Sequence, residues 1–70
     1  MTSIKNAEAV HALGMVCFFN VPEITESSDA YAMSRAMWDI LDKETADPEK
    51  VDLRLRITTF VRAHDLKRPR

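Results

Sequence analysis

The fold of this chain is decided by the stretch DPEKVDLRLRITTF, residues 47–60, which fits either a helix or a strand. It opens on Asp47-Pro48-Glu49, a typical helix start with an acid at the N-cap, proline at the first helical position and a second acid in the first turn. Residues 51–58 instead alternate between apolar and polar side chains, as a half-buried strand does. Leucine and arginine fill four of the eight positions 51–58 and favour helices. We therefore expect a helix at about 48–65, with a strand at about 51–58 as the alternative.

The clearest helical pattern covers about residues 27–45. Apolar side chains recur there at the i, i+3, i+4 and i+7 spacing of one helix face. These residues are Ala30, Met33, Ala36, Met37, Ile40 and Leu41. Tyr31 and Trp38 are seven residues apart and flank this face, and Ser27, Ser28 or Asp29 can cap the helix. The pattern predicts an amphipathic helix.

The first segment, about residues 4–20, also reads as a helix, with apolar side chains most of the way round. Ser3 or Asn6 can serve as its N-cap, and Pro22 disfavours its continuation. A shorter helix that stops at Gly14 and is followed by a strand is the alternative. We favour the continuous helix.

The first and third helices carry more apolar surface than a single contact can cover, so a second copy of the chain would complete the core. Seventy residues form one domain, which we assign to residues 1–66, with a basic C-terminal tail at 67–70. The single cysteine excludes an intrachain disulfide, and one cysteine with two histidines excludes a zinc cage built by this chain alone. The sequence therefore predicts a small all-α domain of three helices, completed by homodimerisation.

No segment resembles a membrane span or a cleavable leader. The longest apolar run, residues 12–19, has eight residues, against the ~20 that a membrane helix needs. Small residues do not follow it in the pattern of a cleavage site. We expect a cytoplasmic protein without a membrane partner.

Charge is strongly segregated along the chain, although the net charge is only −1. Residues 21–52 carry nine acids and three cations, whereas residues 53–70 carry six cations and one acid. These cations are candidate phosphate ligands: Arg54, Arg56, Arg62, Lys67, Arg68 and Arg70. The isoelectric point of about 6.1 is well below that of most nucleic-acid-binding domains. The alternative is that the two segments lie against each other and neutralise.

The sequence gives little support to catalysis. Cys17 with His11 or His64 is the only candidate pair of nucleophile and base. Cys17 lies in the most apolar stretch, where a thiol is generally unreactive, and no glycine-rich loop is present to bind an oxyanion or a phosphate. We expect no enzyme activity, no cofactor and no metal.

Aromatic and methionine side chains are common anchors of protein interfaces. On this basis the candidate protein-binding residues are Tyr31, Met33, Met37 and Trp38. The opposing interpretation is that such a stripe at helical spacing belongs to the core. We predict a small, non-catalytic intracellular regulatory or adaptor protein that acts through protein–protein binding. A dimeric nucleic-acid-binding regulator that uses the basic C-terminal segment is the alternative.

Overall fold

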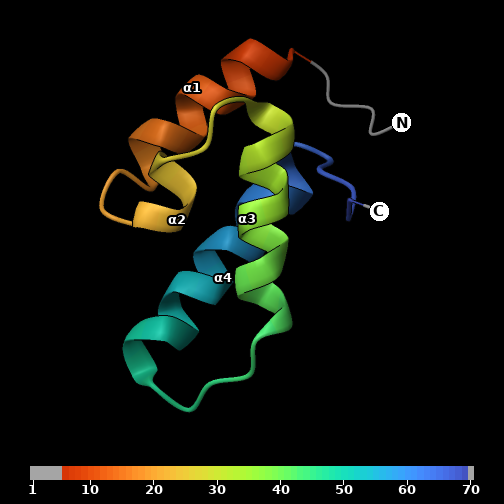
Figure 1. The fold of residues 1–70 in the computed structure, drawn as a ribbon. Helices are drawn as coiled ribbons and strands as arrows, with labels where there is room; N and C mark the ends of the chain where they lie inside the picture. The colour runs from red at the N-terminus through yellow and green to blue at the C-terminus, as the bar shows by residue number, and fades with distance from the viewer. Residues whose placement is uncertain (1–5, 70) are drawn as a thin grey trace.

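The computed structural model describes residues 6–69 and is all-α over that range (Figure 1). Its helices are α1 (Ala7–Cys17), α2 (Pro22–Thr25), α3 (Ala30–Asp42) and α4 (Pro48–Ala63). No strand occurs among the described residues, and residues 51–58 lie within α4. The predicted all-α class is therefore confirmed, and the alternative strand is not formed.

The central element of the fold is α3. It contacts α1, α2 and α4, and α1 also contacts α2. In Figure 1, α4 crosses behind α3, while α1 and α2 lie together beside the first half of α3. The core therefore lies around α3.

A one-turn helix, α2, was not expected from the sequence. Pro22 occupies its first position, where a proline loses no helical hydrogen bond. The proline thus begins α2, whereas α1 already ends at Cys17, short of the predicted residue 20. Asn6 is the N-cap residue of α1, but it has a left-handed backbone with φ 51° and its side chain makes no capping hydrogen bond. Ser3, the other predicted cap, lies outside the described residues.

Both longer predicted helices begin at the acids expected to cap them. The Asp29 carboxylate accepts a hydrogen bond from the Ala32 N–H at 2.8 Å, at the start of α3. At the start of α4, the Asp47 carboxylate accepts from the Glu49 N–H at 3.0 Å. The Thr45 hydroxyl in turn accepts from the Asp47 N–H at 3.1 Å. These bonds satisfy backbone donors that a helix start otherwise leaves unpaired.

The strand-like alternation in α4 is not used for burial. Ile57, Phe60 and Val61, at i, i+3 and i+4, face the core and are buried. Val51 and Leu55 belong to the apolar set of the alternation, yet they are 41% and 64% exposed. The helix start, rather than the alternation, therefore determines the local structure.

The buried core draws side chains from every described helix. Its largest members include Val10, Phe18, Ile24, Met33, Met37, Ile57, Phe60, Val61 and Leu66. The rings of Phe18 and Phe60 meet edge-to-face at 5.5 Å between centroids, which links the end of α1 to α4.

α1 packs tightly against α3 at Gly14. A Cβ atom at this position would lie 2.2 Å from Sδ and 2.9 Å from Cε of Met33. Met33 is fully buried in α3. Because Gly14 has no side chain, the Met33 side chain can occupy this position in the core.

We predict that Gly14→Ala lowers the free energy of unfolding by about 1 kcal/mol or more in urea denaturation. Alanine gains up to about 1 kcal/mol of helix propensity, but overpacking a buried site costs roughly 1–3 kcal/mol. Ala12→Gly, at an exposed position of the same helix, measures the propensity term alone. A Gly14→Ala variant more stable than the wild type by the full propensity term would show that the Met33 side chain moves aside without cost.

The C-terminus of α4 is closed by a Schellman motif. The Leu66 N–H donates to the Val61 carbonyl at 2.9 Å, and the Asp65 N–H donates to the Arg62 carbonyl at 3.4 Å. Leu66 is 3% exposed and belongs to the core cluster. Asp65 takes the left-handed position with φ 52°, which glycine usually occupies. The chain therefore turns back at Asp65, and the segment that follows meets α3.

We predict that Asp65→Val destabilises the protein by about 1–2 kcal/mol, because a β-branched residue is strained at positive φ. Asp65→Asn removes the same charge but tolerates this backbone, so we expect a change within about 0.5 kcal/mol. Thermal and urea unfolding of both variants test the difference. Equal losses in the two variants would assign the effect to the charge of Asp65 instead of its backbone.

Candidate functional site

The structure separates the four predicted protein-binding residues into two groups. Met33 and Met37 are 0% exposed and belong to the core, so no partner can reach them in this structure. Tyr31 is 41% exposed, and the Arg35 guanidinium lies over its ring at 5.8 Å. Trp38 is half-buried. Only Tyr31 and Trp38 can therefore contribute to a surface.

Two of the predicted phosphate ligands instead bind the ends of other helices. Arg54 Nη2 donates to the carbonyl of Leu41 at 2.9 Å, and Arg56 Nη2 donates to that of Cys17 at 2.7 Å. These carbonyls lie in the last turns of α3 and α1, which have no basic residue of their own there. Cations are favourable at helix C-termini, where carbonyls lack partners. α4 therefore supplies the cations that bind the C-terminal carbonyls of α3 and α1.

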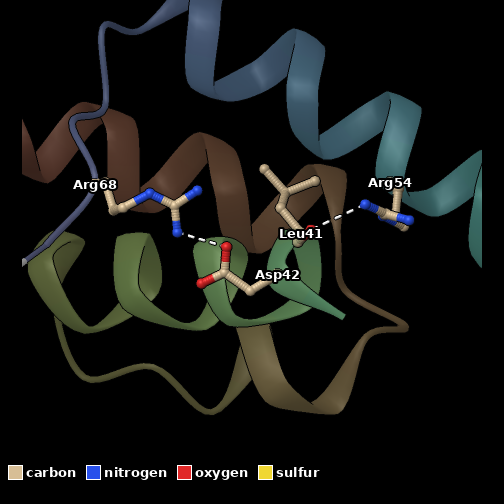
Figure 2. Close-up of polar contacts among 4 residues, drawn as sticks. All are labelled: Leu41, Asp42, Arg54 and Arg68. Carbon is tan, nitrogen blue, oxygen red and sulfur yellow. Dashed lines mark hydrogen bonds and ion pairs between the residues drawn. The ribbon is translucent and has the colours of Figure 1, made fainter. Parts of the chain in front are cut away.

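The remaining predicted cations lie at the end of α4 and beyond it. Arg68 forms an ion pair with Asp42 (Figure 2) and lies 4.5 Å from the centroid of the Trp38 ring. Lys67 pairs with Asp65 at 2.8 Å. Arg62 is exposed in the last turn of α4. The sixth predicted cation, Arg70, lies outside the described residues.

The outward side of α1 carries an apolar surface that the site prediction did not include. Leu13, Val16 and Phe19 are 43%, 71% and 76% exposed. We define the α1 face as these three residues with the exposed Ala9 and Ala12. No Asp, Glu, Lys or Arg occurs anywhere between residues 9 and 19. A helix that faces water normally carries charge on that side, so this face is unusual.

A groove borders the α1 face where α1 passes the last turns of α4. Two adjoining hollows of about 400 and 450 Å³ form it, and both are bordered by Leu13, Ala63 and His64. Phe18 and Phe60 line its central part. The α1 face therefore combines projecting apolar side chains with a groove beside them that is apolar near Phe18 and Phe60 and mixed near Asn6 and Asp65.

The candidate catalytic and metal residues do not converge. His11 Nε2 lies 3.1 Å from the Ser27 carbonyl, whereas the His64 ring packs against Phe60 at 4.4 Å between centroids. Cys17 is half-buried and has a free thiol. Among residues 6–69, no group of three or more His, Cys, Asp or Glu is placed to hold a metal ion.

None of the helices within the described part of the chain is both long and apolar enough to cross a bilayer. Comparisons of the chain with protein-family models, with curated proteins and with solved structures found no match. The candidate function therefore rests on the geometry of this chain alone.

The sequence contained a signal for the α1 face. Residues 9–19 are free of formal charge, which led to the expectation of surplus apolar surface on this helix but not to a site. The roles of Arg54 and Arg56 as caps had no local signal, because their acceptors lie 13 and 39 residues away in sequence.

We predict that Arg54→Gln lowers the free energy of unfolding by about 1–2 kcal/mol, because a charged donor at a helix C-terminus is lost. Arg56→Gln should cost less, about 0.5–1.5 kcal/mol, because its bond is exposed. Arg35→Gln, which removes the same charge from an exposed side chain in the middle of α3, is the matched control and should stay within about 0.5 kcal/mol. Equal losses in all three variants would contradict the capping roles.

Proposed function

We propose that this chain is a small, non-catalytic regulatory or adaptor protein that acts by binding other protein chains through the α1 face. The observation that supports this proposal is the uncharged outward surface of α1, where Leu13, Val16 and Phe19 are exposed. Single exposed apolar residues are common on protein surfaces, but a contiguous apolar patch usually marks an interaction site.

The spacing on α1 suits a helix as the partner. Ala9, Ala12 and Val16 follow one another in α1 at intervals of three and four residues, the spacing of a helix–helix seam, and Phe19 lies just after the end of the helix. The two alanines allow a partner backbone to come close at one end, and Phe19 projects at the other. The groove beside Leu13 can receive a projecting side chain.

A second copy of this chain is the partner that we propose for the α1 face. Because the face carries no formal charge, two copies meet there without like-charge repulsion. Glu8 lies at the N-terminal end of α1, and Arg56 is bound to the Cys17 carbonyl at the other end. Antiparallel packing of two α1 helices would bring Glu8 of each copy toward Arg56 of the other. Such a contact is self-complementary, as a two-fold dimer requires.

A cytoplasmic location is part of the same proposal. The single cysteine, Cys17, is a free thiol in the structure, as is usual for proteins of reducing compartments.

The alternative function, nucleic-acid binding, remains a prediction with weaker support. Arg54, Arg56, Lys67 and Arg68 each already bind a carbonyl or a carboxylate within the chain. A phosphate backbone would have to compete with these partners, which reduces the gain from each contact. Protein binding through the α1 face does not require any of these bonds to break.

We predict that the wild type sediments as a dimer, with a mass near twice 8.0 kDa. Val16→Glu should weaken the dimer at least about tenfold, because it places two carboxylates in an apolar interface. Leu55→Glu is the matched control, since Leu55 is an exposed apolar residue of α4 outside the α1 face. Sedimentation equilibrium measures all three dissociation constants.

A wild type that stays monomeric at high concentration would overturn the homodimer. Protein binding in general is tested by capture from a lysate with the same variants. Capture of the same proteins by wild type and Val16→Glu would overturn the α1 face as the binding surface.

A further inference from the structure

Another cavity lies between α3, α4 and the segment after α4, and Asp65 separates it from the groove beside the α1 face. Its volume is about 580 Å³, within the roughly 300–1,000 Å³ typical of small-molecule sites. Its polar lining consists mainly of Trp38, Arg54, Thr58, Arg62, Lys67 and Arg68. The segment after α4 reaches it because the Schellman motif at Asp65 turns the chain back toward α3.

The cavity is strongly cationic. Four of its lining residues are Arg or Lys, and Asp65 is the only acid among them. Arg54 and Arg68 approach the C-terminal end of α3 from opposite sides, as Figure 2 shows. Arg54 donates to the Leu41 carbonyl and Arg68 pairs with Asp42, which lies beside the cavity. Asp65 and Asp42 partly neutralise Lys67 and Arg68, so the net positive charge of the lining comes mainly from Arg54 and Arg62.

Two hydrogen-bond donors at this cavity have no acceptor. Trp38 Nε1 and Arg54 Nε are buried and lack a hydrogen-bond partner among the described residues. Both residues line the cavity. Buried donors are nearly always paired in folded proteins, so two orphans at one cavity point to an acceptor that residues 6–69 do not supply.

We infer that this cavity binds a small molecule through a compact oxyanion, a phosphate or carboxylate group. Such a group offers several acceptor oxygens, and guanidinium groups bind it with charge-assisted hydrogen bonds. Arg54 and Arg62, eight residues apart on α4, lie on the same side of the helix with Thr58 between them. Lys67 and Arg68 reach the cavity from the chain that follows.

The size and lining of the cavity favour a ligand with an apolar part as well. Leu41, Val61 and Leu66 also line it. A volume of about 580 Å³ exceeds what a single oxyanion fills. The ligand class is therefore a small organic phosphate or carboxylate, with its anionic group toward the arginines.

The chain contains its own reporter for this site, because Trp38 is its only tryptophan. A ¹H–¹⁵N spectrum of the protein therefore shows one indole N–H signal, from one of the two orphaned donors. The signal is followed during titration with sodium phosphate, with sodium acetate and with sodium chloride, at constant ionic strength. We expect a saturable shift with phosphate or acetate and none with chloride. The more effective anion identifies which oxyanion the site prefers.

Charge variants test the location of the site. Arg62→Gln and Lys67→Gln should each weaken the binding of the effective anion at least about threefold, as expected for the loss of one charge a few ångströms away in water. Arg35→Gln is the matched control, because Arg35 is exposed on α3 and does not line the cavity. It should leave the binding constant unchanged. Neither tested residue belongs to the α1 face, so this outcome is independent of the dimer.

Three results would overturn the inference. The first is an indole signal that responds equally to chloride and to the oxyanions. The second is a loss of affinity that is the same in Arg35→Gln as in Arg62→Gln, which would indicate a general charge effect. The third is an affinity for oligonucleotides that increases with their length, which would indicate a nucleic-acid surface instead of a small-molecule site.

Discussion

The contact between Gly14 and Met33 is the constraint on which the other packing depends. Met33 is fully buried in α3, and its sulfur occupies the space that a side chain at Gly14 would fill. Phe60 of α4 also comes within 3.5 Å of that space. A single glycine thus lets α1, α3 and α4 share one point of contact. Because the chain has 70 residues and one small core, the loss of this contact would weaken the packing of all three helices.

The segregation of charge along the sequence has a structural explanation that does not require a partner. The acidic segment ends α3 and begins α4, and the cations of α4 and its tail return to the same region. Arg54 binds the Leu41 carbonyl, and Arg68 binds the Asp42 carboxylate, both at the end of α3. This fits the interpretation that the two segments neutralise each other. The same arrangement places the cations of the C-terminal segment around one cavity.

Local signals predicted the elements, whereas the sites depended on tertiary packing. Asp29 and Asp47 cap the helices they were expected to cap, because a cap is formed by residues two or three apart. The exposure of a methionine depends on its neighbours in space. Helical spacing is the same for a core position as for an interface position, so the sequence did not distinguish the two roles for Met33 and Met37. Arg56 binds the carbonyl of Cys17, the last residue of α1, and this contact is likewise set by the crossing of helices. Such contacts have no signature in a single sequence.

The late position of α4 in the chain has a consequence for synthesis. Ile57, Phe60 and Val61 cover the core from one side, and Leu66 closes it after the last turn of α4. A nascent chain that has completed α3 therefore still exposes Met33 and its apolar neighbours to water. The core is complete only once Leu66 has been added, so until then the growing chain presents unpacked apolar segments to chaperones and proteases.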